Sequence, residues 1–110
     1  MHKSRIMYIE CKARGSLTGP ARIGRVTFSK TGKTLYYAGK TFERLTPCGY
    51  KCNHYDTETG ELYWISGCKR DGNDGLYGGC DAEIDDDVRV EYWTVIRRKP
   101  SNVSSLKVNK

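Results

Sequence analysis

The sequence lacks the long apolar segment that a membrane-spanning helix requires. Such a helix needs roughly 20 consecutive apolar residues, and no run in the 110-residue chain approaches that length. The N-terminal segment MHKSRIMYIE carries basic residues but no apolar stretch behind them, as a secretion signal would. We therefore expect a soluble protein of the cytoplasm with no membrane partner.

Histidine is also scarce, which weakens the case for catalysis. The chain has two histidines, and His2 precedes the first predicted strand. His54 is then the remaining candidate base for a nucleophilic cysteine. Neither a third group to orient it nor an oxyanion site can be identified in the sequence, so we predict a protein that is not an enzyme.

Cysteines are present in an odd number, five, behind no recognisable secretion signal. Such cysteines are more often reduced thiols or metal ligands than a disulfide framework. Zn²⁺ takes four thiolate or imidazole ligands. The spacing of Cys48 and Cys52 suits one pair of ligands, but Cys68 and Cys80 are too far apart in the sequence to form a second pair. The alternative is a set of buried, inert thiols with a surface histidine. The candidate zinc ligands are Cys48, Cys52, His54, Cys68 and Cys80; no other cofactor is predicted.

Length and charge set the broad class. A chain of 110 residues forms one domain with one modest core. We expect an N-terminal extension at 1–6, a single β-rich domain at 7–98 and a polar, flexible tail at 99–110. The 19 lysines and arginines exceed the 13 aspartates and glutamates, which gives a formal net charge of +6. That charge favours an anionic partner.

Turn chemistry predicts a first hairpin around the segment SKTGK. Its glycine supplies the positive φ of a three-residue turn, so that Ser29 pairs with Lys33. This register places Tyr36 opposite Val26 and directs Tyr36 into the core. A further tight turn at 38–40 joins this hairpin to the next strand.

A second hairpin is predicted around DTETGE, with Asp56 facing Glu61. In the strand that follows, Leu62 and Trp64 share one face, while Tyr63 lies on the other. Burying Trp64 and Leu62 removes the most apolar area from water. We therefore expect their face to form the core, with the Tyr63 face as the alternative.

The first predicted strand, at 5–11, has apolar residues on both faces. A strand of this kind lies within a small barrel or is packed on two sides. Gly24, inside the next strand, indicates a bend or a close approach of another segment. Both features are typical of the strong coiling of a small barrel.

The segment at 85–98 is compatible with either a helix or a strand. Val88, Tyr92, Trp93 and Ile96 have helical spacing, and three aspartates suit a helix N-terminus. The β-branched run VRVEYWTVIR also fits a strand, but we favour the helix. The predicted fold is mainly β: a small SH3-like barrel, or curled antiparallel meander, of five or six strands with one C-terminal helix over an open end.

Basic residues alternate with Tyr36, Tyr37 and Phe42 along the predicted sheet. Small β-barrels bind single-stranded nucleic acid by combining cations with aromatic rings on which bases stack. The alternative is that the cations decorate solvent-facing strands while the aromatic side chains fill the core. The candidate nucleic-acid-binding residues are Arg14, Arg22, Arg25, Lys30, Lys33, Tyr37, Lys40, Arg44, Lys69 and Arg70.

The competing prediction is a protein-interaction or self-associating module, with or without a structural zinc. It rests on more aromatic residues than a small core needs and on an acidic cluster that complements the basic sheet. The aromatic candidates are Tyr37, Tyr55, Tyr63, Tyr77 and Trp93. The acidic cluster is Asp81, Glu83, Asp85, Asp86 and Asp87.

The chain contains a distinctive string of motifs: MYIECK, LTGPARIGRVTFSKTGKTLYY, YDTETGELYWISGCK, GLYGG, EIDDDV, and EYW followed by IRR. Over residues 7–98 it resembles a family of small uncharacterised bacterial proteins. Some members carry the label 1-deoxy-D-xylulose-5-phosphate synthase, a thiamine-dependent enzyme. We reject that label, because one small β-domain cannot supply the diphosphate, metal and aminopyrimidine sites that lie between two large domains. The resemblance implies no catalytic residues.

Overall fold

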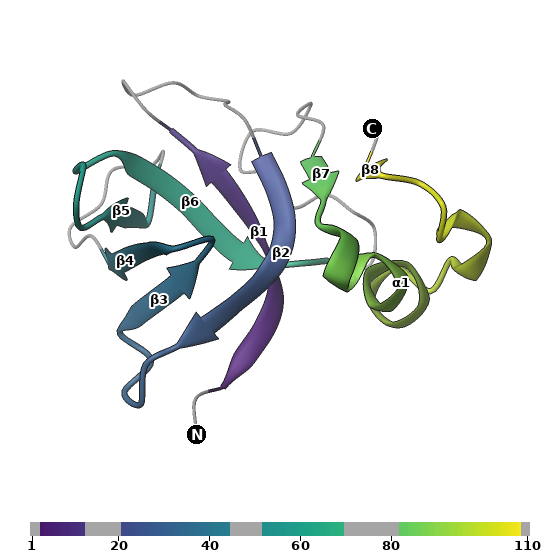
Figure 1. Ribbon diagram of the computed structural model, residues 1–110, viewed down its shortest axis with the longest axis horizontal. Coiled ribbons are helices and arrows are strands. Elements are labelled where there is room, and N and C mark those ends of the chain that lie inside the picture. Colours follow the sequence, from purple (N-terminus) through teal and green to yellow (C-terminus); the bar gives the residue numbers. More distant parts are fainter. Residues whose placement is uncertain (1–2, 13–20, 45–51, 70–81, 109–110) are drawn as a thin grey trace.

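Eight strands are formed by the described residues of this computed structural model, which are 3–12, 21–44, 52–69 and 82–108. The strands are β1 (Ser4–Cys11), β2 (Ala21–Phe28), β3 (Thr34–Tyr37), β4 (Lys40–Arg44), β5 (His54–Asp56), β6 (Leu62–Gly67), β7 (Ala82–Ile84) and β8 (Lys107–Val108). Strands β1 to β6 pair antiparallel in chain order, and the β1–β6 pairing closes them into a barrel (Figure 1). The predicted small SH3-like barrel is confirmed.

Two further strands extend the sheet beyond the barrel. Strand β7 pairs parallel to the start of β2, and β8 pairs antiparallel to β7. The chain reaches β8 after the helix, so this extension brings the C-terminal segment beside the barrel (Figure 1).

The C-terminal segment is helical, as predicted. One 3-10 turn, η2 (Asp86–Val88), leads into α1 (Arg89–Glu91) and then into the π-helical η3 (Tyr92–Ile96). A short 3-10 turn, η4 (Pro100–Asn102), follows. Tertiary burial decides between helix and strand here, because helical spacing collects the bulky apolar residues on one side. No helix in the described part of the chain is long and apolar enough to cross a membrane.

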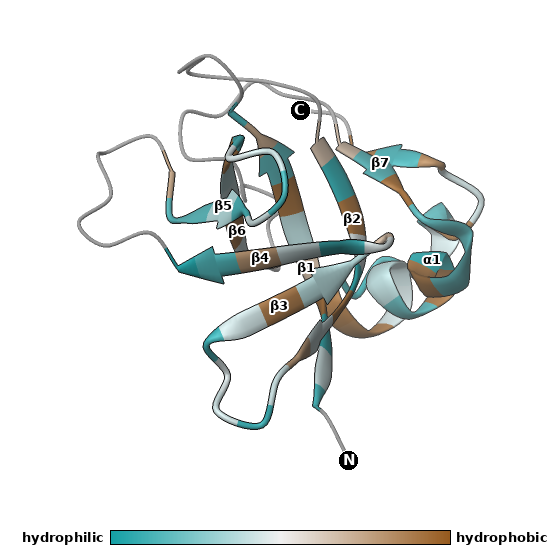
Figure 2. Ribbon diagram, turned by 60° about the vertical axis from the view of Figure 1, so that its left-hand side comes forward, coloured by the Kyte–Doolittle hydropathy of each residue, from teal (hydrophilic) through white to brown (hydrophobic). Residues whose placement is uncertain are grey.

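The barrel interior forms the first of two cores. It holds Met7, Ile9, Val26, Leu35, Phe42, Tyr63 and Ile65. Figure 2 shows the contribution of β3 and β4 as hydrophobic segments in the middle of each strand. Strand side chains alternate between faces, so the neighbours of these residues point out of the barrel.

The second core lies on the outer face of β1 and β2. Ile6 and Tyr8 of β1 and Ile23 of β2 pack there against β7, β8 and the helix. The predicted two-sided burial of the first strand is therefore correct. The sequence predicted a helix over an open end of the barrel. The helix instead covers this outward apolar face of β1 and β2.

The first hairpin is one residue longer than predicted. Ser29 N donates to Thr34 O at 2.9 Å, and Phe28 is paired with Leu35. The Ser29 hydroxyl also accepts a hydrogen bond from Thr34 N at 3.1 Å, which supports the longer turn. The pairing of Ser29 with Lys33 is wrong, and a slip of one residue exchanges the two faces. Leu35 is 2% exposed and Tyr36 is 41% exposed, the reverse of the prediction.

The second hairpin has the predicted register. Asp56 N donates to Glu61 O at 2.9 Å, and Glu58 N donates to Asp56 Oδ1 at 2.9 Å, which lowers the pKa of Asp56. The predicted core face is wrong, because Tyr63 lies in the barrel core. The other face of β6 is half-buried, and Trp64 on that face packs against the second core.

The β3–β4 turn occurs where predicted. Tyr37 pairs with Lys40, and the two residues between them both have positive φ, 51° at Ala38 and 77° at Gly39. This is the backbone of a type I′ turn, whose first position favours asparagine, aspartate or glycine. Alanine pays a steric penalty there.

Ala38→Asn is expected to raise the free energy of unfolding by about 0.5–1 kcal/mol, since asparagine tolerates the left-handed conformation. Urea denaturation of both proteins measures the difference. Ala38→Val is the control, because a β-branched side chain at positive φ is expected to destabilise the protein. A wild type as stable as Ala38→Asn would contradict the prediction.

The folded domain extends beyond the predicted limits of 7 and 98. Strand β1 begins at Ser4, and Ile6 is buried. At the other end, Trp93 Nε1 donates to Ser105 O at 3.0 Å, and Val108 is 4% exposed within the second core. Strand β8 therefore lies within the predicted tail, and Val103 and Val108 contribute to the second core.

Candidate functional site

The predicted basic residues separate to opposite ends of the barrel. One end carries the start of β1, the turn between β2 and β3, and the end of β4. The other end, here called the mouth, carries the end of β1, the start of β2 and the β3–β4 turn. Two predicted residues, Arg14 and Arg70, lie outside the described residues.

Five exposed cations gather at the first end, which we call the basic end: Lys3, Arg5, Lys30, Lys33 and Arg44. A hollow of about 790 Å³ lies between the start of β1 and the β2–β3 turn. A second hollow of about 480 Å³ lies between the same turn and the end of β4. Thr31 lines both hollows, so the turn forms the ridge between them.

The cations of the basic end have no acidic partner within the described residues. None of the ion pairs found there involves them. Glu43 is the one described carboxylate that lines either hollow. Lys69 is exposed but lines neither hollow, and the preceding Cys68 packs against the second core.

Two aromatic side chains are available beside these cations. Phe28 is half-buried and lines the larger hollow. Tyr36 is exposed on the outer face of β3, where Thr27 and Thr41 flank it. Phe42, in contrast, is fully buried in the barrel core and cannot stack on a base. The correct hairpin register would have identified Tyr36 as the exposed ring.

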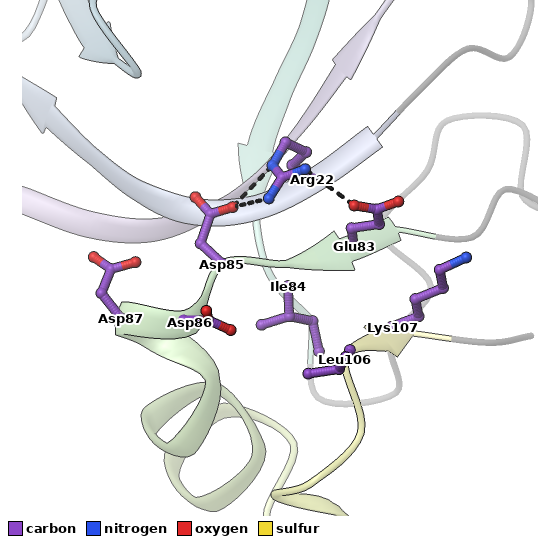
Figure 3. Close-up of a pocket in the computed structure, with 8 residues that line it drawn as sticks. All are labelled: Arg22, Glu83, Ile84, Asp85, Asp86, Asp87, Leu106 and Lys107. Atoms are coloured by element: carbon purple, nitrogen blue, oxygen red, sulfur yellow. Dashed lines mark hydrogen bonds and ion pairs between the residues drawn. The ribbon is translucent and has the colours of Figure 1, made fainter.

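Arg22 belongs to an ion-pair network at the mouth. Its Nε and Nη2 atoms donate to Asp85 Oδ1 at 2.8 and 2.6 Å, and Nη1 donates to Glu83 Oε2 at 3.1 Å (Figure 3). The Tyr37 hydroxyl donates to Asp85 Oδ2 at 2.5 Å. Burial and this hydrogen bond raise the pKa of Tyr37 to about 12. Gly24 lies against Asp85 and Tyr37, which is the close approach that the sequence predicts.

Two other predicted cations also contact carboxylates. Arg25 Nη2 lies 2.8 Å from Glu91 Oε1, and Lys40 Nζ lies 3.7 Å from Asp56 Oδ2. Neither lies at the basic end. Arg22, Arg25 and Lys40 therefore have carboxylate neighbours and lie apart from the five cations of the basic end. Their part in nucleic-acid binding stays a prediction.

The acidic cluster is largely engaged within its own chain. Asp86 Oδ1 lies 2.8 Å from Arg89 Nη1, and Glu83 and Asp85 are bound by Arg22. These residues line a hollow of about 680 Å³ beside β7 and β8 (Figure 3). Asp81 lies outside the described residues. Self-association through this cluster stays a prediction.

Two of the four described residues of the predicted aromatic groove are buried. Tyr63 is in the barrel core and Trp93 is in the second core, so neither is exposed. The Tyr55 hydroxyl donates to Glu43 at 3.3 Å on the outer face of the sheet. Tyr77 lies outside the described residues.

The zinc site is not assembled by the described ligands. Cys52 and His54 are buried, whereas Cys68 packs against the second core. Within the described ranges, no three His, Cys, Asp or Glu side chains are grouped so as to hold a metal ion. Cys48 and Cys80 lie outside these ranges, so the complete zinc site stays a prediction.

His54 is not the surface histidine of the alternative interpretation. Its Nδ1 atom lies 2.8 Å from Asn53 Oδ1. Burial, and then the charge of Arg44, lower the pKa of His54 to about 4. The imidazole is therefore neutral at neutral pH and adds no charge to the basic end.

A small apolar pocket occupies the mouth. Its volume is about 210 Å³. The described residues that line it are Ile9, Cys11, Arg22, Tyr37, Ala38, Lys40, Phe42 and Tyr63. Burial and the neighbouring Cys11 thiol raise the pKa of Tyr63. No feature of the sequence predicted this pocket, because its lining comes from five strands.

Comparisons with protein-family models, curated proteins and solved structures find no match for this chain. The family resemblance of its motifs therefore stays a prediction. Functional roles rest on the chemistry of the two barrel ends.

Proposed function

We propose that the protein binds single-stranded nucleic acid at the basic end of the barrel. The observation that carries this proposal is the grouping of five exposed cations, without acidic partners in the described chain, around two adjoining hollows. An uncompensated cationic surface attracts a polyanion and releases its condensed counterions.

The β2–β3 turn is the centre of the proposed surface. Lys30 lines the larger hollow and Lys33 the smaller one, so cations stand on both sides of the ridge. A strand that crosses this ridge meets the start of β1 on one side and Arg44 on the other. Its phosphates would be neutralised in both hollows.

The exposed aromatic rings favour single-stranded over duplex nucleic acid. Stacking on a protein ring requires an unpaired base, and each stack contributes roughly 1–3 kcal/mol. Tyr36 offers an exposed ring on β3, and Phe28 lines the larger hollow. The stacked bases would then be recognised by their faces, with little dependence on sequence.

Fluorescence anisotropy with a labelled 12-nucleotide oligomer at several salt concentrations tests this proposal. Lys30→Gln combined with Lys33→Gln is expected to reduce the slope of log K against log salt by about 1.4, at roughly 0.7 for each lost phosphate contact. Tyr36→Ala is expected to weaken binding about fivefold or more without changing the slope, because it removes a stack and no charge.

Lys107→Gln is the matched control. It removes an exposed lysine from β8, beside the hollow lined by the acidic cluster. Its affinity and its salt slope should equal those of the wild type, unlike those of the basic-end variants. Unchanged anisotropy of the wild type at low salt would refute the proposal. If Lys107→Gln reduced the slope of log K against log salt as much per lost lysine, binding would depend on the net charge of the protein and not on the position of the cations at the basic end.

A further inference from the structure

We infer that the mouth of the barrel is a second binding site, for a small molecule with an aromatic body and one anionic group. The pocket there has a floor of Ile9, Phe42 and Tyr63, contributed by three strands. Its charged lining within the described residues consists of Arg22 and Lys40, with no carboxylate. This site lies at the opposite end from the basic surface and does not depend on the proposed function.

The existence of the cavity is the first argument. Barrels of few strands are filled by their own side chains, and protein interiors are packed nearly without voids. This barrel follows that rule below the mouth, where its core residues are buried. An unfilled apolar cavity lowers stability, so its retention is explained most simply by an occupant.

The size of the cavity limits that occupant. At about 210 Å³ it is smaller than the roughly 300–1,000 Å³ of most small-molecule sites. The rings of Phe42 and Tyr63 meet edge to face, with centroids 4.7 Å apart. A third ring can extend this arrangement, and the Cys11 sulfur on the same wall is a favourable neighbour for an aromatic edge. A single aromatic ring therefore fits best.

Lys40 is the group that selects an anion. Its Nζ atom lies 3.7 Å from Asp56 Oδ2, which is too long for a good hydrogen bond. Glu58 N donates to the other oxygen of this carboxylate, Asp56 Oδ1, at 2.9 Å. The Lys40 ammonium is half exposed at the rim and makes no short bond to Asp56, so it can approach a ligand anion that enters the pocket.

The guanidinium of Arg22 is a second hydrogen-bond donor at the rim, after Lys40, and its position is fixed. Three of its N–H groups are used by Asp85 and Glu83, which lock the guanidinium in place. Arginine carries five N–H donors, and the bonds to Asp85 and Glu83 account for three of them. The Tyr37 side chain, anchored by its own bond to Asp85, forms the adjoining wall. The rim is thus organised before any ligand binds.

The test is an NMR titration of ¹⁵N-labelled protein with three probes that differ in charge: phenylacetate, phenylacetamide and phenethylamine. Saturable shifts are expected at the amides of Ile9, Phe42 and Tyr63, with phenylacetate bound at least fivefold more tightly than phenylacetamide and phenethylamine bound most weakly. No saturable shift with any probe, or equal affinity for phenylacetate and phenylacetamide, would overturn the inference.

Two variants at the mouth and one control variant at the basic end locate the binding. Lys40→Gln should weaken phenylacetate binding at least fivefold and leave phenylacetamide binding unchanged, whereas Lys30→Gln at the basic end should affect neither. Cys11→Leu should fill the pocket and abolish binding of all three probes. The inference would also be overturned if the probes still bound to Cys11→Leu, or if they shifted the amides of the basic end instead. Lys40 is exposed, so Lys40→Gln remains informative if Cys11→Leu fails to fold.

Discussion

Replacing Lys12 by methionine is expected to lower the free energy of unfolding by about 3–5 kcal/mol. Lys12 is 0% exposed, and its Nζ atom lies 2.9 Å from Oε2 of Glu10, which is 1% exposed. The Tyr8 hydroxyl donates to the other carboxylate oxygen at 2.7 Å. Without the lysine, the Glu10 carboxylate, which is shielded from water, loses the cation that lies 2.9 Å from it. Chemical denaturation of wild type and variant measures the loss.

A double-mutant cycle separates the charge effect from lost packing. Glu10→Met alone is expected to destabilise the protein by a similar amount, because it leaves the Lys12 ammonium buried. The double variant should be clearly more stable than the sum of the single losses implies, since replacing both members of a buried ion pair is close to neutral. Both side chains make further contacts, so full recovery is not expected.

Lys107→Met serves as the control for the loss of a lysine. Its side chain is exposed on β8, and surface substitutions of this kind change stability by no more than about 0.5 kcal/mol. Strictly additive losses in the Glu10 and Lys12 cycle would contradict a coupled buried pair. So would a Lys12→Met protein as stable as Lys107→Met.

Gly24→Ala is expected to destabilise the protein by about 1–3 kcal/mol through overpacking. A Cβ atom at this position would collide with Asp85 Oδ2 and with Cε1 of Tyr37. Relief of the collision must move the hydrogen bond between these two side chains and the Arg22 pairing on the same carboxylate. A thermal melt followed by circular dichroism measures the effect.

Gly67→Ala provides the matched comparison, because Gly67 is also a strand glycine with a neighbour close to its missing Cβ. There the neighbour is Arg5 Nη2 at 2.9 Å, the end of a long and flexible side chain that can move away. This variant should stay within about 0.5 kcal/mol of wild type. Equal destabilisation by both substitutions would show that the Asp85 and Tyr37 contacts do not explain the requirement for Gly24.

Local signals predicted much of the fold. The turns at 38–40 and 56–61, the helix at 85–98 and the two-sided first strand are each encoded within a few neighbouring residues. Gly24 indicated a close approach, although its partners could not be named. The first hairpin failed because a turn of three residues and a turn of four both suit SKTGK, and one residue of difference exchanges the faces.

The candidate site was less predictable than the fold. Three predicted residues, Lys30, Lys33 and Arg44, lie at the basic end. Lys3 and Arg5, in contrast, were missed, because 1–6 reads as an extension until β1 is paired with β2. Their position beside the β2–β3 turn follows from a pairing between residues far apart in sequence.

Composition, turn chemistry and hydrophobic spacing in the sequence determined a small mainly β domain, a net positive charge and one C-terminal helix. Tertiary structure alone decided which charges remain available. Arg22 is paired with Asp85, 63 residues further along the chain, and Arg25 with Glu91, 66 residues away. Local patterns carry no information on contacts at such separation, because barrel closure and helix docking create them. The same closure placed the basic end and the mouth pocket at opposite ends of the barrel.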